Sequence, residues 1–237
     1  MELSEQQKDE GRKAVHSHNI TFKDWLRQHD AVPDTGGLIP FTRWLTPAGI
    51  PKRYSTQMYI YFLPLDSALK PPGSQQMHIA TPDGGVEHVA ARFLHAQEWL
   101  DLSIRKEIVM FPPQFILLSL IAPFLAPSGS GRDGLSTNAL MEQRERLRKW
   151  IESDGDPPWR EKCISPDVVE KVRNHWMVMG LAKPGPELEG TTRKGDSERV
   201  VRVELDKVIE RGRQRPRPVE VLWRKDVEVG KGQLAKI

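Results

Sequence analysis

The sequence contains a single cysteine and no long uninterrupted apolar run. Cys163 on its own excludes an internal disulfide and supplies no pair of thiols at the spacing of a metal site. The most apolar segment, Ile108 to Leu125, is interrupted by prolines and polar residues, so it falls short of the ~20 apolar residues of a membrane-spanning helix. We therefore expect no membrane partner, and we expect this segment to pack in a core.

Charge of one sign is not in large excess either. Lys and Arg together number 35 and Asp and Glu 32, so the formal net charge of +3 is a small surplus. This balance implies no nucleic-acid partner. The N-terminal stretch is polar and acidic, without the basic and apolar regions of a secretory signal. We expect an intracellular protein, either cytosolic or peroxisomal, because the final Ala-Lys-Ile is loosely similar to a peroxisomal Ser-Lys-Leu ending.

The motifs of several common active sites are also missing. The seven histidines include no His-Glu-x-x-His pair, and the chain has no Walker-type glycine loop and no dinucleotide-binding fingerprint. A Gly-x-Ser-x-Gly nucleophile motif is absent as well. These absences exclude the zinc, P-loop, Rossmann and serine-hydrolase sites that such motifs identify.

The stretch from Leu38 to Pro64 is the most informative part of the chain. Two apolar runs flank a turn that contains Pro47, Gly49 and Pro51, a pattern that predicts strand, turn and strand. Proline fixes φ and removes backbone donors, so we expect a stiff turn. Three cations lie near the strand ends: Arg43, Lys52 and Arg53. They suit an anionic ligand such as a phosphate; a solvated basic turn without a ligand is the alternative.

Two other residues are candidates for chemistry. Glu87 follows two consecutive glycines, which let another group approach the backbone closely, so it is a candidate Mg²⁺ ligand or general base. An ordinary exposed glutamate is the alternative interpretation. Trp44 has an indole that can stack on a nucleotide base, and core packing is its alternative role.

Apolar periodicity and helix caps predict most of the remaining elements. Helices are expected over residues 4–15, 21–28, 96–102, 139–151 and 165–178, and a buried helix is expected to begin at Pro112. Strands are expected over 86–94, and as a two-stranded ribbon over 198–205 and 219–223. Residues 126–138 are rich in Pro, Gly and Ser, which is typical of a linker. This linker divides the chain into an α/β domain over 1–125 and a charged extension over 139–237, made of helices and a β-hairpin.

Several short motifs follow one another in a characteristic order. They are Leu-Ile-Pro-Phe-x-Arg-Trp-Leu-Thr-Pro from Leu38, Lys-Arg-Tyr-x-Thr from Lys52, Gly-Gly-x-Glu ending at Glu87, Glu98-Trp99, and Glu-Ile-Val-Met-Phe-Pro-Pro-Gln-Phe ending at Phe115. Over residues 38–125 this order resembles the C-terminal part of the Nudix hydrolases of the acyl-coenzyme A diphosphatase type, including their fungal relatives.

The resemblance implies a fold and an activity. The fold is a Nudix-like α/β/α sandwich around a mixed sheet, here incomplete at its N-terminal side, so that residues 1–125 form a partial Nudix domain. The activity is cleavage of a nucleoside diphosphate-linked compound such as coenzyme A or acyl-coenzyme A, with Mg²⁺ or Mn²⁺ as the metal. The implied substrate-binding residues are Arg43, Trp44, Lys52, Arg53 and Gln114, and the implied metal ligand is Glu87.

One part of the family pattern has no counterpart in these residues. The Nudix box, whose glutamates hold the metal, is not found; the nearest pairing, Arg144-Glu145, lacks the Glu-Glu that should follow. Ser55 stands where the family has aspartate. One carboxylate cannot hold a metal against the charge of a diphosphate, so we expect no catalysis by the chain as written. Two hypotheses follow: a partial product of a diphosphatase gene, or a non-catalytic remnant that binds a nucleotide or a protein.

Overall fold

The structure, a computed structural model, describes residues 3–33, 35–63, 65, 92–125, 136–173, 176–204 and 219–229. The chain divides into two compact units, one of residues 1–37 with 63–93 and one of residues 38–62 with 94–237. The described residues form six α-helices, two short 3-10 helices and two β-sheets, which makes this a mixed α/β protein. The second unit includes residues on both sides of the predicted linker.

The first unit contains two short helices, α1 (Glu5–His16) and α2 (Phe22–Gln28). Both confirm the sequence prediction, and the predicted capping box is present at the start of α1, because the Ser4 side chain accepts from the amide of Gln7. Trp25 of α2 lies directly against Gly11 of α1, where a Cβ atom would come within 2.2 Å of the indole. A glycine at this position is what allows the two helices to pack closely.

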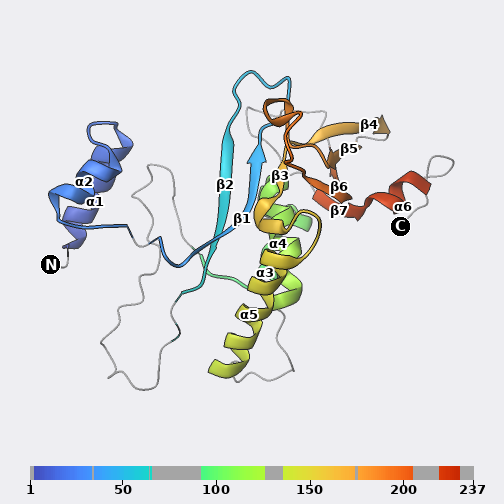
Figure 1. The fold of residues 1–237 in the computed structure, drawn as a ribbon. Helices are drawn as coiled ribbons and strands as arrows, with labels where there is room; N and C mark the ends of the chain where they lie inside the picture. Colours follow the sequence, from blue (N-terminus) through green and yellow to red (C-terminus); the bar gives the residue numbers. More distant parts are fainter. Residues whose placement is uncertain are drawn as a thin grey trace. The chain divides into compact units, whose positions relative to one another are not determined.

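The second unit contains the predicted hairpin as part of a three-stranded sheet. Strand β1 (Leu38–Leu45) pairs antiparallel with β2 (Ser55–Tyr61) and parallel with β3 (Cys163–Ile164), so this sheet is mixed (Figure 1). Because β1 is central, its side chains are largely buried, whereas those of the edge strand β2 are more exposed. The sheet thus combines the hairpin with a strand from the predicted extension.

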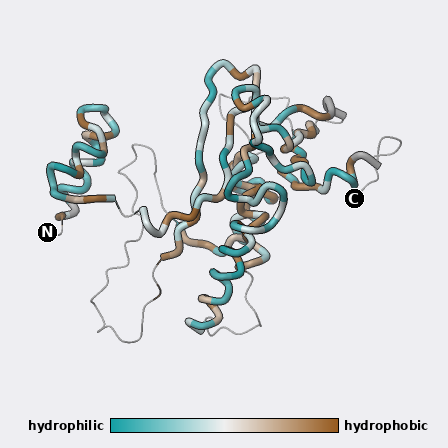
Figure 2. Tube along the Cα trace, viewed as in Figure 1, coloured by the Kyte–Doolittle hydropathy of each residue, from teal (hydrophilic) through white to brown (hydrophobic). Residues whose placement is uncertain are grey.

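Three helices accompany this sheet in the same unit: α3 (Ala96–Ile104), α4 (Pro112–Leu125) and α5 (Thr137–Ser153). All three were predicted, and the two prolines of α4 lie in its first turn, where amides have no helical partner. Helix α5 begins within the predicted linker because Ser136 caps it. Helix α3 packs against α4, and α4 packs against α5. Figure 2 shows that α5 is mostly hydrophilic, in keeping with the single narrow stripe that it buries.

The second sheet of this unit has four antiparallel strands in sequential order. They are β4 (Asp167–Arg173), β5 (Trp176–Leu181), β6 (Asp196–Glu204) and β7 (Val219–Trp223), and helix α6 (Arg224–Val229) follows β7. The predicted ribbon is confirmed as β6 and β7. The helix predicted over 165–178 is wrong, because this segment forms β4 and the start of β5. Its β-branched Val168, Val169 and Val172 favour extended backbone over a helix.

Two sequence predictions lie largely outside the described residues. The expected strand over 86–94 covers 86–91, which are not described, and residues 92–94, which have no regular structure. Most of the expected linker, 126–135, is not described either. Among the described residues, no helix has the length and apolarity needed to cross a membrane.

Aromatic packing around Trp159 forms the centre of the core in the second unit. This residue belongs to the 3-10 helix η1 (Trp159–Glu161), and its ring lies 6.1 Å from the ring of Phe41 and 5.1 Å from that of Trp150. The aliphatic residues Leu147, Ile151 and Ile164 are fully buried in the same cluster. Strand β1, helix α5 and the segment before β3 therefore share one packed core.

We predict that Trp159→Ala lowers the free energy of unfolding by about 3–5 kcal/mol, because it leaves a cavity at a side chain that is 2% exposed. Urea denaturation followed by circular dichroism measures this change. The matched control is Phe111→Ala, which truncates a side chain that is 59% exposed and should change the stability by no more than about 0.5 kcal/mol. Equal effects of the two substitutions would contradict the assigned core.

Candidate functional site

The turn between β1 and β2 is held by a pair of hydrogen bonds across its base. The amide of Thr46 donates to the carbonyl oxygen of Tyr54 at 3.0 Å, and the amide of Tyr54 donates to Thr46 Oγ1, also at 3.0 Å. Together with Pro47 and Pro51, these bonds restrict the backbone on both sides of the turn. The stiff basic turn expected from the sequence is therefore present.

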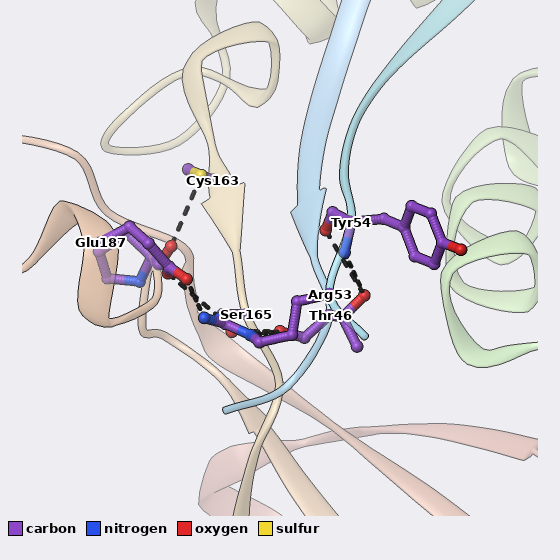
Figure 3. A network of polar contacts seen from close by, with 7 residues as sticks. Thr46, Arg53, Tyr54, Cys163, Ser165 and Glu187 are labelled. Carbon is purple, nitrogen blue, oxygen red and sulfur yellow. Dashed lines mark hydrogen bonds and ion pairs between the residues drawn. The ribbon is translucent and has the colours of Figure 1, made fainter. Parts of the chain in front are cut away.

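Arg53 is the most constrained cation of this turn. Its Nε donates to the carbonyl oxygen of Thr46 at 3.0 Å, and its two terminal nitrogens donate to the two carboxylate oxygens of Glu187. Figure 3 shows the Arg53 side chain extended toward Glu187, while the ring of Tyr54 points away from this pair. The Arg53 side chain is 24% exposed and that of Glu187 is 48% exposed, so the carboxylate is the more accessible partner.

Glu187 reaches Arg53 because the loop between β5 and β6 lies against the end of β1. Ser165 donates its amide to the carbonyl oxygen of Lys183 at 2.8 Å, and Cys163 Sγ lies 3.7 Å from the carbonyl oxygen of Pro184 (Figure 3). The next residue, Gly185, has φ +99° and comes so close that a Cβ atom would lie 3.1 Å from Ser165 Cβ. This loop leads into the 3-10 helix η2 (Pro186–Leu188), which carries the carboxylate.

The other two predicted cations, Arg43 and Lys52, remain available to solvent. Arg43 is exposed on β1 and donates from Nε to Ser55 Oγ at 2.8 Å. Lys52 is exposed, with Nζ 5.4 Å from the centre of the Tyr54 ring, and no carboxylate pairs with it within the described ranges. The hairpin thus carries all three predicted cations, of which Arg53 alone holds a carboxylate of the described chain in a bidentate pair.

Trp44 and Gln114 lie in different surroundings from these cations. The Trp44 indole is buried in the core and donates from Nε1 to Thr42 Oγ1 at 2.8 Å, so it presents no free face to a ligand. Gln114 Oε1 accepts from the amide of Phe111 at 2.9 Å and thereby caps the start of α4. The Trp44 side chain is therefore used in packing, and that of Gln114 in capping.

The implied metal site finds no support in the described part of the chain. Within it, no three or more His, Cys, Asp or Glu side chains are placed to hold a metal ion. Glu87, the predicted ligand, lies outside the described residues. The described residues therefore provide no set of ligands that fits Mg²⁺ or Mn²⁺. No hydrolytic step is assigned to them. The chemistry that the basic turn can perform is the binding of an anion.

Sequence reasoning missed Glu187. The residue lies 134 positions from Arg53, and no local pattern links the two. The Pro184-Gly185-Pro186 run marks a turn in the sequence, but it does not indicate which part of the fold that turn contacts. Only the pairing of strands brings this carboxylate to the basic turn.

Two buried titratable groups, Cys163 and Lys162, lie beside Arg43 of β1. Burial raises the pKa of the Cys163 thiol, although Arg43 and Arg193 oppose the shift by favouring the thiolate. Burial lowers the pKa of Lys162, whose ammonium lies 4.9 Å from the centre of the Trp159 ring, while the charge of Asp196 opposes that shift. Both side chains are almost wholly buried, so neither is placed to meet a ligand from solvent.

We predict that Cys163 resists a chromogenic disulfide reagent in the folded protein and reacts fully in urea, because the thiol is buried and its pKa is raised. The neutral Cys163 thiol makes its full contribution to stability at pH values below the ordinary pKa of a thiol. This contribution is lost as the pH rises through the raised pKa of the folded protein. Cys163→Ala should therefore reduce the loss of stability at alkaline pH, measured by urea denaturation across that range. Rapid labelling of the native protein would contradict the buried placement.

Comparison with known proteins adds no assignment. No protein-family model matches the chain, and neither a curated protein nor a solved structure matches it.

Proposed function

We propose that this chain provides a substrate-binding face of a Nudix-type hydrolase, for a nucleoside diphosphate-linked compound of the coenzyme A class. The observation that carries the proposal is the stiff basic turn between β1 and β2, which belongs to the stretch that resembles the family. Arg43 and Lys52 are exposed on it, and Arg53 is oriented by the backbone of Thr46.

The arrangement of charge suits a diphosphate. Arginine offers a planar set of donors that matches phosphate oxygens, and lysine adds a compact positive charge. A cation whose position is fixed before binding loses less conformational entropy when a ligand arrives. Arg53 has this property, because its Nε is already bonded to Thr46.

An exposed aromatic ring lies next to the cations. Tyr54 is 58% exposed, and its ring points away from the Arg53–Glu187 pair (Figure 3). The ammonium of Lys52 lies 5.4 Å from the centre of this ring. A ring and a cation side by side offer a stacking surface for a base and a charge for a phosphate. This supports a nucleotide over a simple inorganic anion.

The finer fold assignment, a Nudix-like α/β/α sandwich, is part of the same proposal. It is supported by the mixed sheet around β1 and by the helices α3 and α4, which carry the Glu98-Trp99 and Pro-Pro-Gln motifs. The chain would contribute binding residues to such a site. No cluster of carboxylates that could hold a metal ion is found among the described residues. The described residues are therefore proposed to bind substrate and not to catalyse its cleavage.

A second candidate is a binding module without catalysis, for a nucleotide or a protein partner. The observation that favours it is Ser55, which stands where the family has aspartate and whose hydroxyl accepts from Arg43. A hydroxyl cannot supply the negative charge of a carboxylate, so Ser55 does not neutralise the charge of Arg43. The two candidates differ in whether binding depends on Mg²⁺.

We predict that isothermal titration detects binding of coenzyme A and ADP-ribose, and that Arg43→Ala and Lys52→Ala each weaken it by about 3- to 10-fold, because each removes a charge-assisted contact. The control is Lys149→Ala, which removes an exposed lysine from α5 and should leave the affinity unchanged. Stronger binding with Mg²⁺ would favour the hydrolase, and equal binding without it would favour the module. If neither ligand binds, the proposed function is wrong.

A further inference from the structure

We infer that the two terminal nitrogens of Arg53 form a subsite for a phosphoryl group of the ligand, and that Glu187 occupies this subsite when no ligand is bound. Glu187 is thus a built-in competitor, and an anion binds to Arg53 by displacing it. The inference rests on the proposed function for the identity of the ligand, but the competition itself follows from the geometry around Arg53.

The subsite is formed without any contribution from Glu187. Arg53 Nε is bonded to the carbonyl oxygen of Thr46, and the two Thr46–Tyr54 hydrogen bonds hold that carbonyl in place. Its two terminal nitrogens each donate to one oxygen of the Glu187 carboxylate (Figure 3). A carboxylate and a phosphate present their oxygens to arginine in the same bidentate way, so the bound carboxylate marks where a phosphoryl group fits.

Glu187 is the partner that can move. It lies on η2, a single short turn bounded by Gly185 with φ +99° and Gly190 with φ +80°, two positions at which the backbone takes left-handed angles. Its side chain is 48% exposed, and exposed ion pairs are weakly held. The base of the turn that carries Arg53 is tied by its own hydrogen bonds, so displacement leaves the cation in position.

The nearby cations favour a ligand with more than one negative charge. Lys52 precedes Arg53 in the chain and has no carboxylate partner within the described ranges, whereas Lys183 is already paired with Asp167 at 2.8 Å. A phosphoryl group carries up to two negative charges where a carboxylate carries one, so it gains more from the cations of this turn. Because the competitor must first leave, the apparent affinity of the parent chain is lower than that of the empty subsite.

The test is isothermal titration of the full chain with ADP, comparing the parent with Glu187→Gln and Glu189→Gln. The two variants change the net charge equally, but Glu189 has no ion pair among the described residues. We expect Glu187→Gln to bind ADP about 3- to 5-fold more tightly than the parent, since a neutral amide competes poorly for a guanidinium. Glu189→Gln should bind like the parent, and both variants should melt within a few degrees of it, because exposed ion pairs add little stability.

A further substitution, Arg53→Lys in the Glu187→Gln background, keeps the charge but removes the planar donors, and it should abolish the gain. If the parent and both glutamine variants bind ADP equally while Lys52→Ala weakens it, the competition is disproved and the proposed function stands. If none of them binds ADP, both are disproved. An equal gain in the two glutamine variants would reduce the effect to net charge and overturn the role of Glu187.

Discussion

The packing of one buried indole, that of Trp159, connects parts of the second unit that are far apart in sequence. Its ring contacts Phe41 of β1 and Trp150 of α5, and the guanidinium of Arg199 from β6 lies 5.3 Å from its centre. Aromatic and cation–π contacts of this kind add to the area that the ring buries. Both sheets and the longest helix among the described residues therefore depend on a residue that belongs to neither sheet.

The surroundings of the basic turn follow from this core. Because η1 directly precedes β3, the placement of Trp159 sets β3 beside β1. The chain then continues to Ser165, which holds the loop that carries Glu187 against the end of β1. The charge that Arg53 meets is thus determined by a loop of the second sheet, and not by the turn on which Arg53 lies.

Local patterns in the sequence predicted most elements, since their causes are local. Helix α1 follows from the Ser4 capping box, and the β1–β2 hairpin from two apolar runs around a proline-rich turn. The segment of β4 was mistaken for a helix, because Ser165-Pro-Asp is also a helix-start pattern, and pairing with β5 overrides such a pattern. The candidate site was predicted as three cations, whereas the carboxylate that Arg53 holds was not, because their contact is long-range.

The sequence by itself determined the caps, the stiff turn and the cations that this turn carries, because these depend on residues within a few positions of one another. Only the tertiary structure decided that Trp44 lies in the core and that Arg53 meets Glu187. The physical reason is that burial and ion pairing depend on which distant segments share a core. In this chain the packing around Trp159 and the pairing of β3 with β1 determine which distant segments lie together.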